Sequence, residues 1–232
     1  MGQERERVFH DDRWASGDRE RSATNRIYRL TRESFERTWG SVNRAAQGKD
    51  TVELGCGPGD TNTASIAQSY VGIDISPVVI DQARRAHPGI RFEVGEAESM
   101  PFKNNSVDLV YGFGVLHHVE LDLALAELHR ILRTGGMAVF REPMGHNPVI
   151  NAYRRRTPTM RTPEEHPFTR ADLGRIASIF DTQCEYFHLL TLASTVLPFA
   201  SRPLSAVDRV LLASWSPLRY WAWVVVLVLS KP

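Results

Sequence analysis

With 232 residues, the chain is long enough to bury the core of one α/β domain. Its 28 basic and 27 acidic side chains leave a net charge of +1, without the concentrated positive charge of most nucleic-acid binders. We therefore expect no nucleic-acid partner. The two cysteines, Cys56 and Cys184, are too few for a disulfide framework and lack CxxC spacing, which favours a reducing cytoplasm and implies no metal site.

The two ends of the chain carry no membrane-spanning signal. The first residues, MGQERERVFHDDRW, are charged from Glu4 onward and contain no apolar stretch, which argues against an ordinary secretory signal. Near the other end, the run YWAWVVVLVL (220–229) is about half as long as a spanning helix, and its β-branched residues favour a buried strand. We expect a single cytoplasmic domain over 1–232.

Residues 1–48 are rich in arginine and acidic residues, and Ile27, Leu30 and Phe35 recur there at near-helical spacing. This part is predicted to form an N-terminal helical cap. Residues 49–145 alternate short apolar runs with amphipathic stretches, the pattern of parallel strands joined by helices in an α/β fold. The expected strands are 52–54, 70–73, 90–94, 107–111 and 137–141.

Two helices are expected between these strands. One begins after Asp60 and carries Ala64, Ile66 and Ala67, and the other covers LDLALAELHRIL (121–132), where RTGG predicts a glycine stop. In the remaining part, 146–232, a Pro-punctuated stretch precedes a helix from Arg170. Two late apolar runs, 185–192 and 223–229, are expected to be strands.

The stretch VELGCGPGD places Gly55, Gly57 and Gly59 at every second position after an apolar strand. A glycine-rich turn before a helix lets an anionic ligand approach the main chain closely. The spacing is G-x-G-x-G, whereas dinucleotide sites use G-x-G-x-x-G, and Pro58 removes an amide that a pyrophosphate would bind. The turn therefore favours a nucleotide ligand without a pyrophosphate.

An acidic residue, Asp74, follows the second expected strand about twenty residues after the first glycine. A carboxylate there can accept hydrogen bonds from both hydroxyl groups of a ribose. The alternative is structural: the glycines form only a tight turn, and Asp74 caps the helix after DISP.

Four ordered motifs resemble the class I S-adenosylmethionine-dependent methyltransferases, in the small-molecule branch called methyltransferase type 11 or UbiE-like. They are VELGCGPG, VGIDISPVVIDQAR, VGEAESMPFKNNSVDLVYGFGVLHHV and ELHRILRTGGMAVFREP, within 51–143. The resemblance implies a Rossmann-like sheet of seven strands, mostly parallel with an antiparallel last strand, and helices on both faces. It also implies a segment inserted between the last two strands.

The same resemblance implies S-adenosyl-L-methionine as the cofactor. In that family the glycine turn holds the methionine end of the cofactor, so Gly55, Gly57 and Gly59 would lie against it, with Glu53 just beneath. Asp74 would hold the ribose.

Further contacts are implied for the adenine and the methionine portion. Ile75 would pack on the adenine, and Glu96 with Ala97 would lie at its amino edge, where the family more often has Asp than Glu. Gly112 and Phe113 would border the methionine portion. Phe113 could equally be a core aromatic residue.

Methyl transfer is an in-line displacement at a sulfonium, so positioning supplies most of the acceleration, and a base matters only where the acceptor must lose a proton. His117 and His118 follow the fourth strand, and His146 follows the fifth, where Glu142 could orient it. His117 serves either proton transfer or loop structure, while His118 is expected to pack underneath. His166 is a contact candidate in the lid.

The segment NAYRRRTPTMRTPEEHPF crowds arginines near Tyr153, and these could hold a carboxylate or phosphate or could simply form a solvated face. They are Arg154, Arg155, Arg156 and Arg161. The later part, 189–229, is unusually apolar. It could form a hydrophobic pocket, a homodimer surface, a face that touches a membrane, or extra core.

We expect an enzyme that methylates a lipophilic small molecule, preferentially at a hydroxyl, with a histidine base. Methylation at carbon or nitrogen of a quinone-like, isoprenoid or natural-product scaffold is an alternative. So is a cyclase that binds the cofactor without using its methyl group, because fold does not fix reaction. A dinucleotide-dependent reductase and a non-enzymatic interaction module fit the residues less well.

Overall fold

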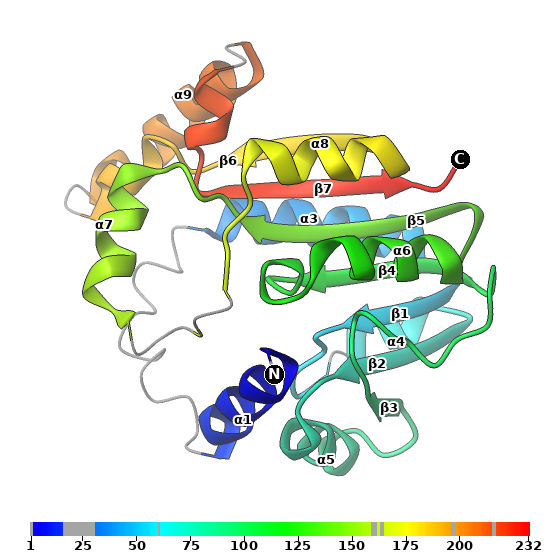
Figure 1. Cartoon of the computed structure of the whole chain (residues 1–232). Coiled ribbons are helices and arrows are strands. Elements are labelled where there is room, and N and C mark those ends of the chain that lie inside the picture. The colour runs from blue at the N-terminus through cyan, green and yellow to red at the C-terminus, as the bar shows by residue number, and fades with distance from the viewer. Residues whose placement is uncertain are drawn as a thin grey trace.

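The structure is a computed structural model that describes residues 2–15, 31–59, 61–158, 162, 165–195, 198–214 and 217–232 (Figure 1). Four positions named above, Ile27, Leu30, Asp60 and Arg161, lie outside these residues.

Within the described ranges, seven strands form one sheet in the order β3-β2-β1-β4-β5-β7-β6 (Figure 1). The strands β1 to β5 pair in parallel, and β7 pairs antiparallel with both β5 and β6. This confirms the expected Rossmann-like methyltransferase sheet. The bounds are β1 Asp50–Leu54, β2 Ser69–Asp74, β3 Arg91–Val94, β4 Val107–Phe113, β5 Leu132–Pro143, β6 Asp181–Phe187 and β7 Val224–Ser230.

Helices cover both faces of the sheet, with α6 and α8 in front of it and α3 behind it in Figure 1. The helices are α1 Gly2–Ala15, α3 Arg32–Ala46, α4 Thr61–Ile66, α5 Pro77–Ala86, α6 Leu121–Ile131, α7 Pro148–Arg156, α8 Arg170–Ile179 and α9 Ser201–Ser214. Short 3-10 helices cover Leu116–His118, Thr191–Thr195, Pro198–Ala200 and Leu218–Trp221.

The core has two layers because successive strand residues face opposite sides of the sheet. On β5, Phe140 packs with the α6 and α8 residues of one cluster, while Val139 packs with the α3 and α5 residues of the other. Strand β1 has β2 on one side and β4 on the other, so the chain order reverses there. Ligands of open α/β sheets bind at the carboxyl ends of the strands beside such a reversal.

Two boundaries differ from the expectation. The helix α6 ends at Ile131, and RTGG lies inside β5 instead of ending a helix, because Leu132 already pairs with Val107. The register shifts between Val107 and Leu109, next to Gly135 with φ +75°. The strand β6 starts at Asp181, earlier than the apolar run 185–192. The apolar pattern misses this start because β6 is an edge strand whose first six residues are exposed or half-buried.

The stretch 220–229 forms a buried strand, as expected, only from Val224 onward, where it makes up most of β7, while Tyr220 and Trp221 end a 3-10 helix. The helix α9 lies in the segment between β6 and β7, also as expected. Its buried Asp208 accepts hydrogen bonds from the backbone N–H groups of Leu189, Leu190 and Thr191 at 2.7–3.0 Å, which anchors the helix on the chain after β6. Among the described helices, none combines the length and apolarity that crossing a membrane requires.

Candidate active site

The glycine turn follows the carboxyl end of β1 and needs its glycines. Gly55, Gly57 and Gly59 have φ of +67°, +53° and +94°, in the left-handed region that only glycine adopts without strain. A Cβ on Gly55 would also lie 2.4 Å from the Cγ2 atom of Val115. The turn thus keeps bare backbone facing the loop that follows β4.

Asp74, at the end of β2, closes this turn from the side. Its carboxylate accepts hydrogen bonds from the N–H groups of Gly57 and Ser76, each at 3.0 Å. Burial raises the pKa of Asp74, against the opposing effect of these two N–H groups. The strand that carries the acid and the strand that carries the turn are neighbours, which explains their fixed separation in sequence.

A cavity of about 840 Å³, open to solvent, lies over the turn. Seven of the ten residues predicted to hold the cofactor line it: Gly55, Gly57, Asp74, Ile75, Glu96, Ala97 and Phe113. The other three do not. Glu53 is buried and accepts a hydrogen bond from the hydroxyl of Tyr70, Gly59 packs against Phe92, and Gly112 packs against Phe140.

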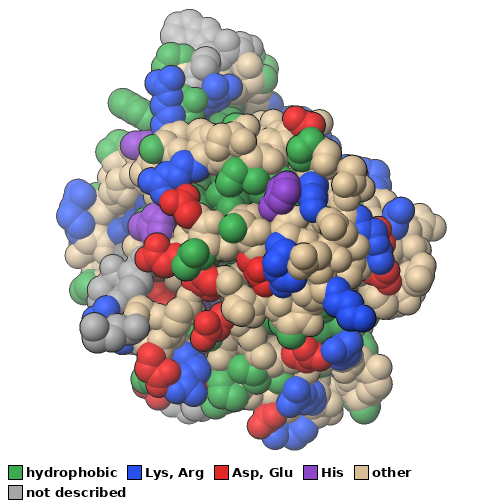
Figure 2. Space-filling model, turned by 45° about the vertical axis from the view of Figure 1, so that its right-hand side comes forward, with side chains coloured by type: hydrophobic (Ala, Val, Ile, Leu, Met, Phe, Trp, Pro, Cys, Tyr) green, Lys and Arg blue, Asp and Glu red, His purple; other side chains and the backbone are tan. Residues whose placement is uncertain are grey.

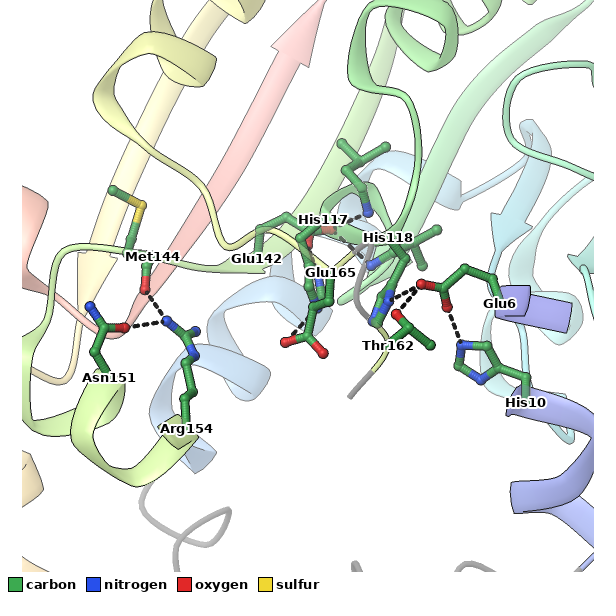
Figure 3. Close-up of polar contacts among 12 residues, drawn as sticks. Glu6, His10, His117, His118, Glu142, Met144, Asn151, Arg154, Thr162 and Glu165 are labelled. Atoms are coloured by element: carbon green, nitrogen blue, oxygen red, sulfur yellow. Dashed lines mark hydrogen bonds and ion pairs between the residues drawn. The ribbon is translucent and has the colours of Figure 1, made fainter. Parts of the chain in front are cut away.

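The helix α1 covers this cavity through a buried carboxylate that the sequence patterns did not single out. Glu6 lies with one oxygen 3.4 Å from Nδ1 of His118 and the other 3.5 Å from Nε2 of His10, and Thr162 donates its hydroxyl to it (Figure 3). Burial alone would raise the pKa of Glu6, but these contacts outweigh it and hold that pKa well below its usual range. The only local signal was the Glu6–His10 spacing of four residues on a helix.

Two groups in the described residues have the types and spacing of metal ligands. Glu6, His10 and His118 form one group, and His117, His118 and Glu165 form the other, with ligand atoms within 4.8 Å. His118 belongs to both, and burial lowers its pKa. The first group is explained without a metal, because the contact of Glu6 with His118 joins α1 to the 3-10 helix after β4, and the contact of Glu6 with His10 lies within α1.

A second cavity, of about 1050 Å³, adjoins the first and shares four of its wall residues, Arg13, Phe113, Gly114 and His118. The rest of its wall comes from α1, α3, the 3-10 helix after β4, the end of β5, α7, Glu165 and the start of β7: Phe9, Phe35, His117, Arg141, Pro143, Ile150, Tyr153, Arg154, Glu165, Trp223 and Val224. Phe113 also packs on the ring of Trp39 at 4.7 Å, so it is both a core aromatic residue and a wall residue.

His117 lines this second cavity and forms a buried pair with Glu142, which does not belong to the lining (Figure 3). Nδ1 of His117 lies 2.7 Å from Oε2 of Glu142. The other carboxylate oxygen accepts hydrogen bonds from the N–H groups of Val115 and Leu116 at 3.0 Å. Burial raises the pKa of Glu142 to about 7, although the two N–H groups act in the opposite direction.

The expected pairing of Glu142 with His146 does not form. His146 lies at the surface, where its Nε2 accepts a hydrogen bond from the N–H of Arg170 at 3.4 Å, because the chain turns away after β5 to begin α7. His166 is exposed and does not line either cavity. His118, expected to pack underneath, lies in the walls of both cavities.

Of the three consecutive arginines 154–156, one lines the second cavity and two lie at the surface. Arg154 faces the second cavity and donates to the carbonyl of Met144 at 3.1 Å and to Oδ1 of Asn151 at 2.9 Å (Figure 3). Arg155 and Arg156 are exposed. Arg141, which the patterns did not single out, is buried in the cavity wall with its guanidinium 4.0 Å from the ring centre of Phe35.

Part of this chain is similar to known methyltransferases. Residues 52–140 match the family model of a methyltransferase domain. The demethylmenaquinone methyltransferase of Chlorobaculum parvum is 39% identical over 105 residues, which cover 43% of this chain and 43% of the relative. The phthiotriol/phenolphthiotriol dimycocerosates methyltransferase of Mycobacterium leprae is 34% identical over 122 residues, covering 50% of this chain and 44% of the relative.

A solved structure shows the same fold. Phosphoethanolamine N-methyltransferase 2 of Haemonchus contortus, in complex with phosphomonomethylethanolamine and S-adenosylhomocysteine, aligns with a TM-score of 0.61 and 17% identity, over 85% of this chain and 52% of that one. The chain spans less than half the length of the two curated relatives.

Proposed function

We propose that this chain, whose residues 52–140 match the family model of a methyltransferase domain, is a class I S-adenosylmethionine-dependent methyltransferase that transfers the methyl group of S-adenosyl-L-methionine to a hydroxyl of a lipophilic small molecule. One observation carries the proposal: the cavity over the glycine turn adjoins a second cavity, and Phe113, Gly114 and His118 line both. A cofactor in the first cavity would thus present its methyl group to an acceptor in the second.

The first cavity suits the parts of the cofactor. The positive-φ turn at Gly55 and Gly57 leaves room for the methionine portion beside the loop after β4. Asp74 lies at the carboxyl end of β2 with its carboxylate oriented by two N–H groups, which suits hydrogen bonds from the ribose hydroxyls. Ile75, Glu96 and Ala97 lie in the same wall and would bound the adenine.

The second cavity suits an apolar acceptor with an ionisable hydroxyl. Its aromatic residues, Phe9, Phe35 and Trp223, would pack on an apolar scaffold, beside the charged residues of the same wall, Arg13, Arg141, Arg154 and Glu165. Two relatives, named for demethylmenaquinone and for phthiotriol dimycocerosates, support an acceptor of this class.

Within this proposal His117 acts as the general base. Glu142 lies at Nδ1, so it favours the tautomer with the proton on Nδ1, and Nε2, which lies 4.0 Å from Oε1 of Glu165, would accept the hydroxyl proton. The acceptor oxygen then attacks the methyl carbon in line with the carbon–sulfur bond, and the sulfur leaves with the bonding electrons as a neutral thioether. The proton stays on His117 until product release, and no covalent enzyme intermediate is needed.

The experiment is calorimetric titration with S-adenosylmethionine, S-adenosylhomocysteine and NADH, in the wild type and in Asp74→Ala. We expect both sulfur nucleotides to bind and the variant to bind them more weakly. A screen of hydroxylated lipophilic compounds should then yield S-adenosylhomocysteine together with a product heavier by one methylene unit. An isomer formed without cofactor turnover would indicate a cyclase, and binding of NADH alone would overturn the proposal.

The atom of the acceptor that receives the methyl group must be identified in a separate measurement. A methyl signal bound to oxygen in the product's nuclear magnetic resonance spectrum supports the hydroxyl assignment, whereas a new carbon–carbon or carbon–nitrogen bond would replace it. The cytoplasmic location, a homodimer and the absence of nucleic-acid partners stay predictions from the sequence.

A further inference from the structure

Exposed apolar side chains concentrate on the segment between β6 and β7. Of the ten large hydrophobic side chains that are exposed in the described part of the chain, half belong to this segment. They are Leu190, Phe199, Val207, Val210 and Trp221, and we call them the insertion face. Phe199 is 83% exposed and Val210 is 64% exposed, values far above those of a packed hairpin connection.

The outward orientation of this face is built into α9. Val207 and Val210 are three residues apart and share one side of the helix, while Asp208 and Leu212 on the other side are buried. Because Asp208 binds three consecutive N–H groups after β6, the helix is held with its apolar side outward. The opposite rotation would bury Val207 and Val210 but would expose this capping carboxylate.

The charge around the insertion face is one-sided. The stretch 189–223 contains Arg202, Arg209 and Arg219 against the single acid Asp208, which is buried. The neighbouring helix α7 adds the exposed Arg155 and Arg156 and contains no acidic residue. Arg209 makes an ion pair with Glu33 at 3.6 Å, but no acidic side chain of this stretch opposes the others. Figure 2 shows hydrophobic and basic side chains together on the projecting part at its top.

Apolar side chains bordered by arginines match the chemistry of an anionic lipid surface. Phe, Val and Trp side chains can enter the boundary between headgroups and acyl chains, while arginines bind the phosphate groups above them. Binding to a neutral apolar surface on a second protein would not require this excess of positive charge. We propose that the insertion face docks the protein on the surface of an anionic phospholipid bilayer.

This docking would bring the second cavity toward the lipid. Ile150, Trp223 and Val224 line that cavity and also belong to the hydrophobic cluster that includes Leu192 of the insertion. In Figure 1, α7 and α9 lie beyond the same end of β5, β6 and β7. An amphiphilic acceptor could then enter from the bilayer. The docking itself, however, does not depend on the methyl-transfer proposal.

The test is co-sedimentation of the full chain with vesicles of phosphatidylcholine, either alone or mixed with phosphatidylglycerol. We expect partitioning onto the anionic vesicles that is at least about tenfold stronger than onto the neutral ones. The double variant Phe199→Ser, Val210→Ser should lower that partitioning by about tenfold or more, since both side chains would lose their burial in lipid. Arg202→Gln should weaken binding to the anionic vesicles only.

Leu123→Ser is the matched control, because Leu123 is 58% exposed but lies on α6. It should bind vesicles as the wild type does. Equal binding of all variants, or no binding to any vesicle, would overturn the proposal. So would a dimer in solution that the double variant dissociates, because a second copy would then cover the face. Titration with S-adenosylhomocysteine without vesicles, performed on every variant, confirms folding and separates failure of docking from failure of the cofactor assignment.

Discussion

Nδ1 of His117 lies 2.7 Å from Oε2 of Glu142, and this contact joins the 3-10 helix after β4 to the end of β5. One carboxylate oxygen of Glu142 accepts hydrogen bonds from the N–H groups of Val115 and Leu116 and the other contacts His117, so the carboxylate positions both the loop and the imidazole. The pair faces the proposed acceptor and not the proposed cofactor, because His117 lines only the second cavity. Its removal should therefore separate catalysis from cofactor binding.

Replacing His117 by Asn should lower kcat by about 10²- to 10⁴-fold if a hydroxyl is the acceptor, because the base is lost. Affinity for S-adenosylhomocysteine should stay within about threefold of the wild type, since the residue lies outside the first cavity. His146→Asn is the control, as its side chain lies at the surface and should leave kcat unchanged. Steady-state kinetics and calorimetry measure both quantities. Full activity of His117→Asn would remove the base from the mechanism.

Glu142 should make the stability of the protein depend on pH. Burial raises its pKa from 4.5 to about 7. A carboxyl group with a raised folded-state pKa stabilises the fold below about pH 4.5 and loses that contribution as the pH rises to about 7. The loss should be roughly 3 kcal/mol and constant at higher pH. His117 and His118 are the titratable side chains that act on this carboxyl.

Urea unfolding of Glu142→Gln tests this. The amide keeps an acceptor for the N–H groups of Val115 and Leu116 but cannot ionise, so the variant should show a weaker fall in unfolding free energy between these pH values. Other acids, such as Asp74, titrate in both proteins and cancel in the difference. Parallel pH profiles for the wild type and the variant would show that Glu142 does not titrate as described.

The sequence was sufficient for the parallel strands, the glycine turn and the acid on β2, because each depends on residues close together in the chain. It was not sufficient for the partner of Glu142. Pairing of β4 with β5 aligns Phe113 with Arg141 and brings Glu142 to the loop that starts at Gly114, a contact over 25 residues that no local pattern encodes. The same limit applies to Glu6, whose partners His118 and Thr162 lie more than a hundred residues away.

Gly57→Val should abolish measurable binding of S-adenosylhomocysteine while the sheet still folds. The side chain would occupy the wall of the first cavity, and the φ of +53° adds backbone strain of about 1–2 kcal/mol. Gly135→Val is the matched control, because Gly135 also has positive φ, at +75°, but meets open space away from both cavities. The Gly135→Val variant should have a lower free energy of unfolding but should bind S-adenosylhomocysteine as the wild type does. Retained affinity in Gly57→Val would mean that the nucleotide binds elsewhere.

Glu6→Gln should loosen α1 from the first cavity. The buried carboxylate contacts His118 and Thr162, which lie outside α1, and also His10 on α1 itself, so a neutral amide would weaken the contacts that join the helix to the rest of the site. We expect the affinity for S-adenosylhomocysteine to fall about tenfold. This corresponds to a loss of roughly 1.4 kcal/mol from the free energy with which α1 closes over the first cavity. Amide hydrogen exchange should also speed up along α1 but not along β1, where the glycine turn begins.

Glu4→Gln is the control for this change, since Glu4 lies on the same helix but is exposed and pairs with Arg7 on that helix. It removes the same charge from the same helix, so it separates the loss of the buried contacts from the loss of charge near the cavity. Equal exchange and equal affinity in the two variants would show that electrostatics alone, and not the Glu6 contacts, hold α1 in place. A larger effect of Glu6→Gln on the dissociation rate than on the association rate would show that α1 closes after the nucleotide has entered.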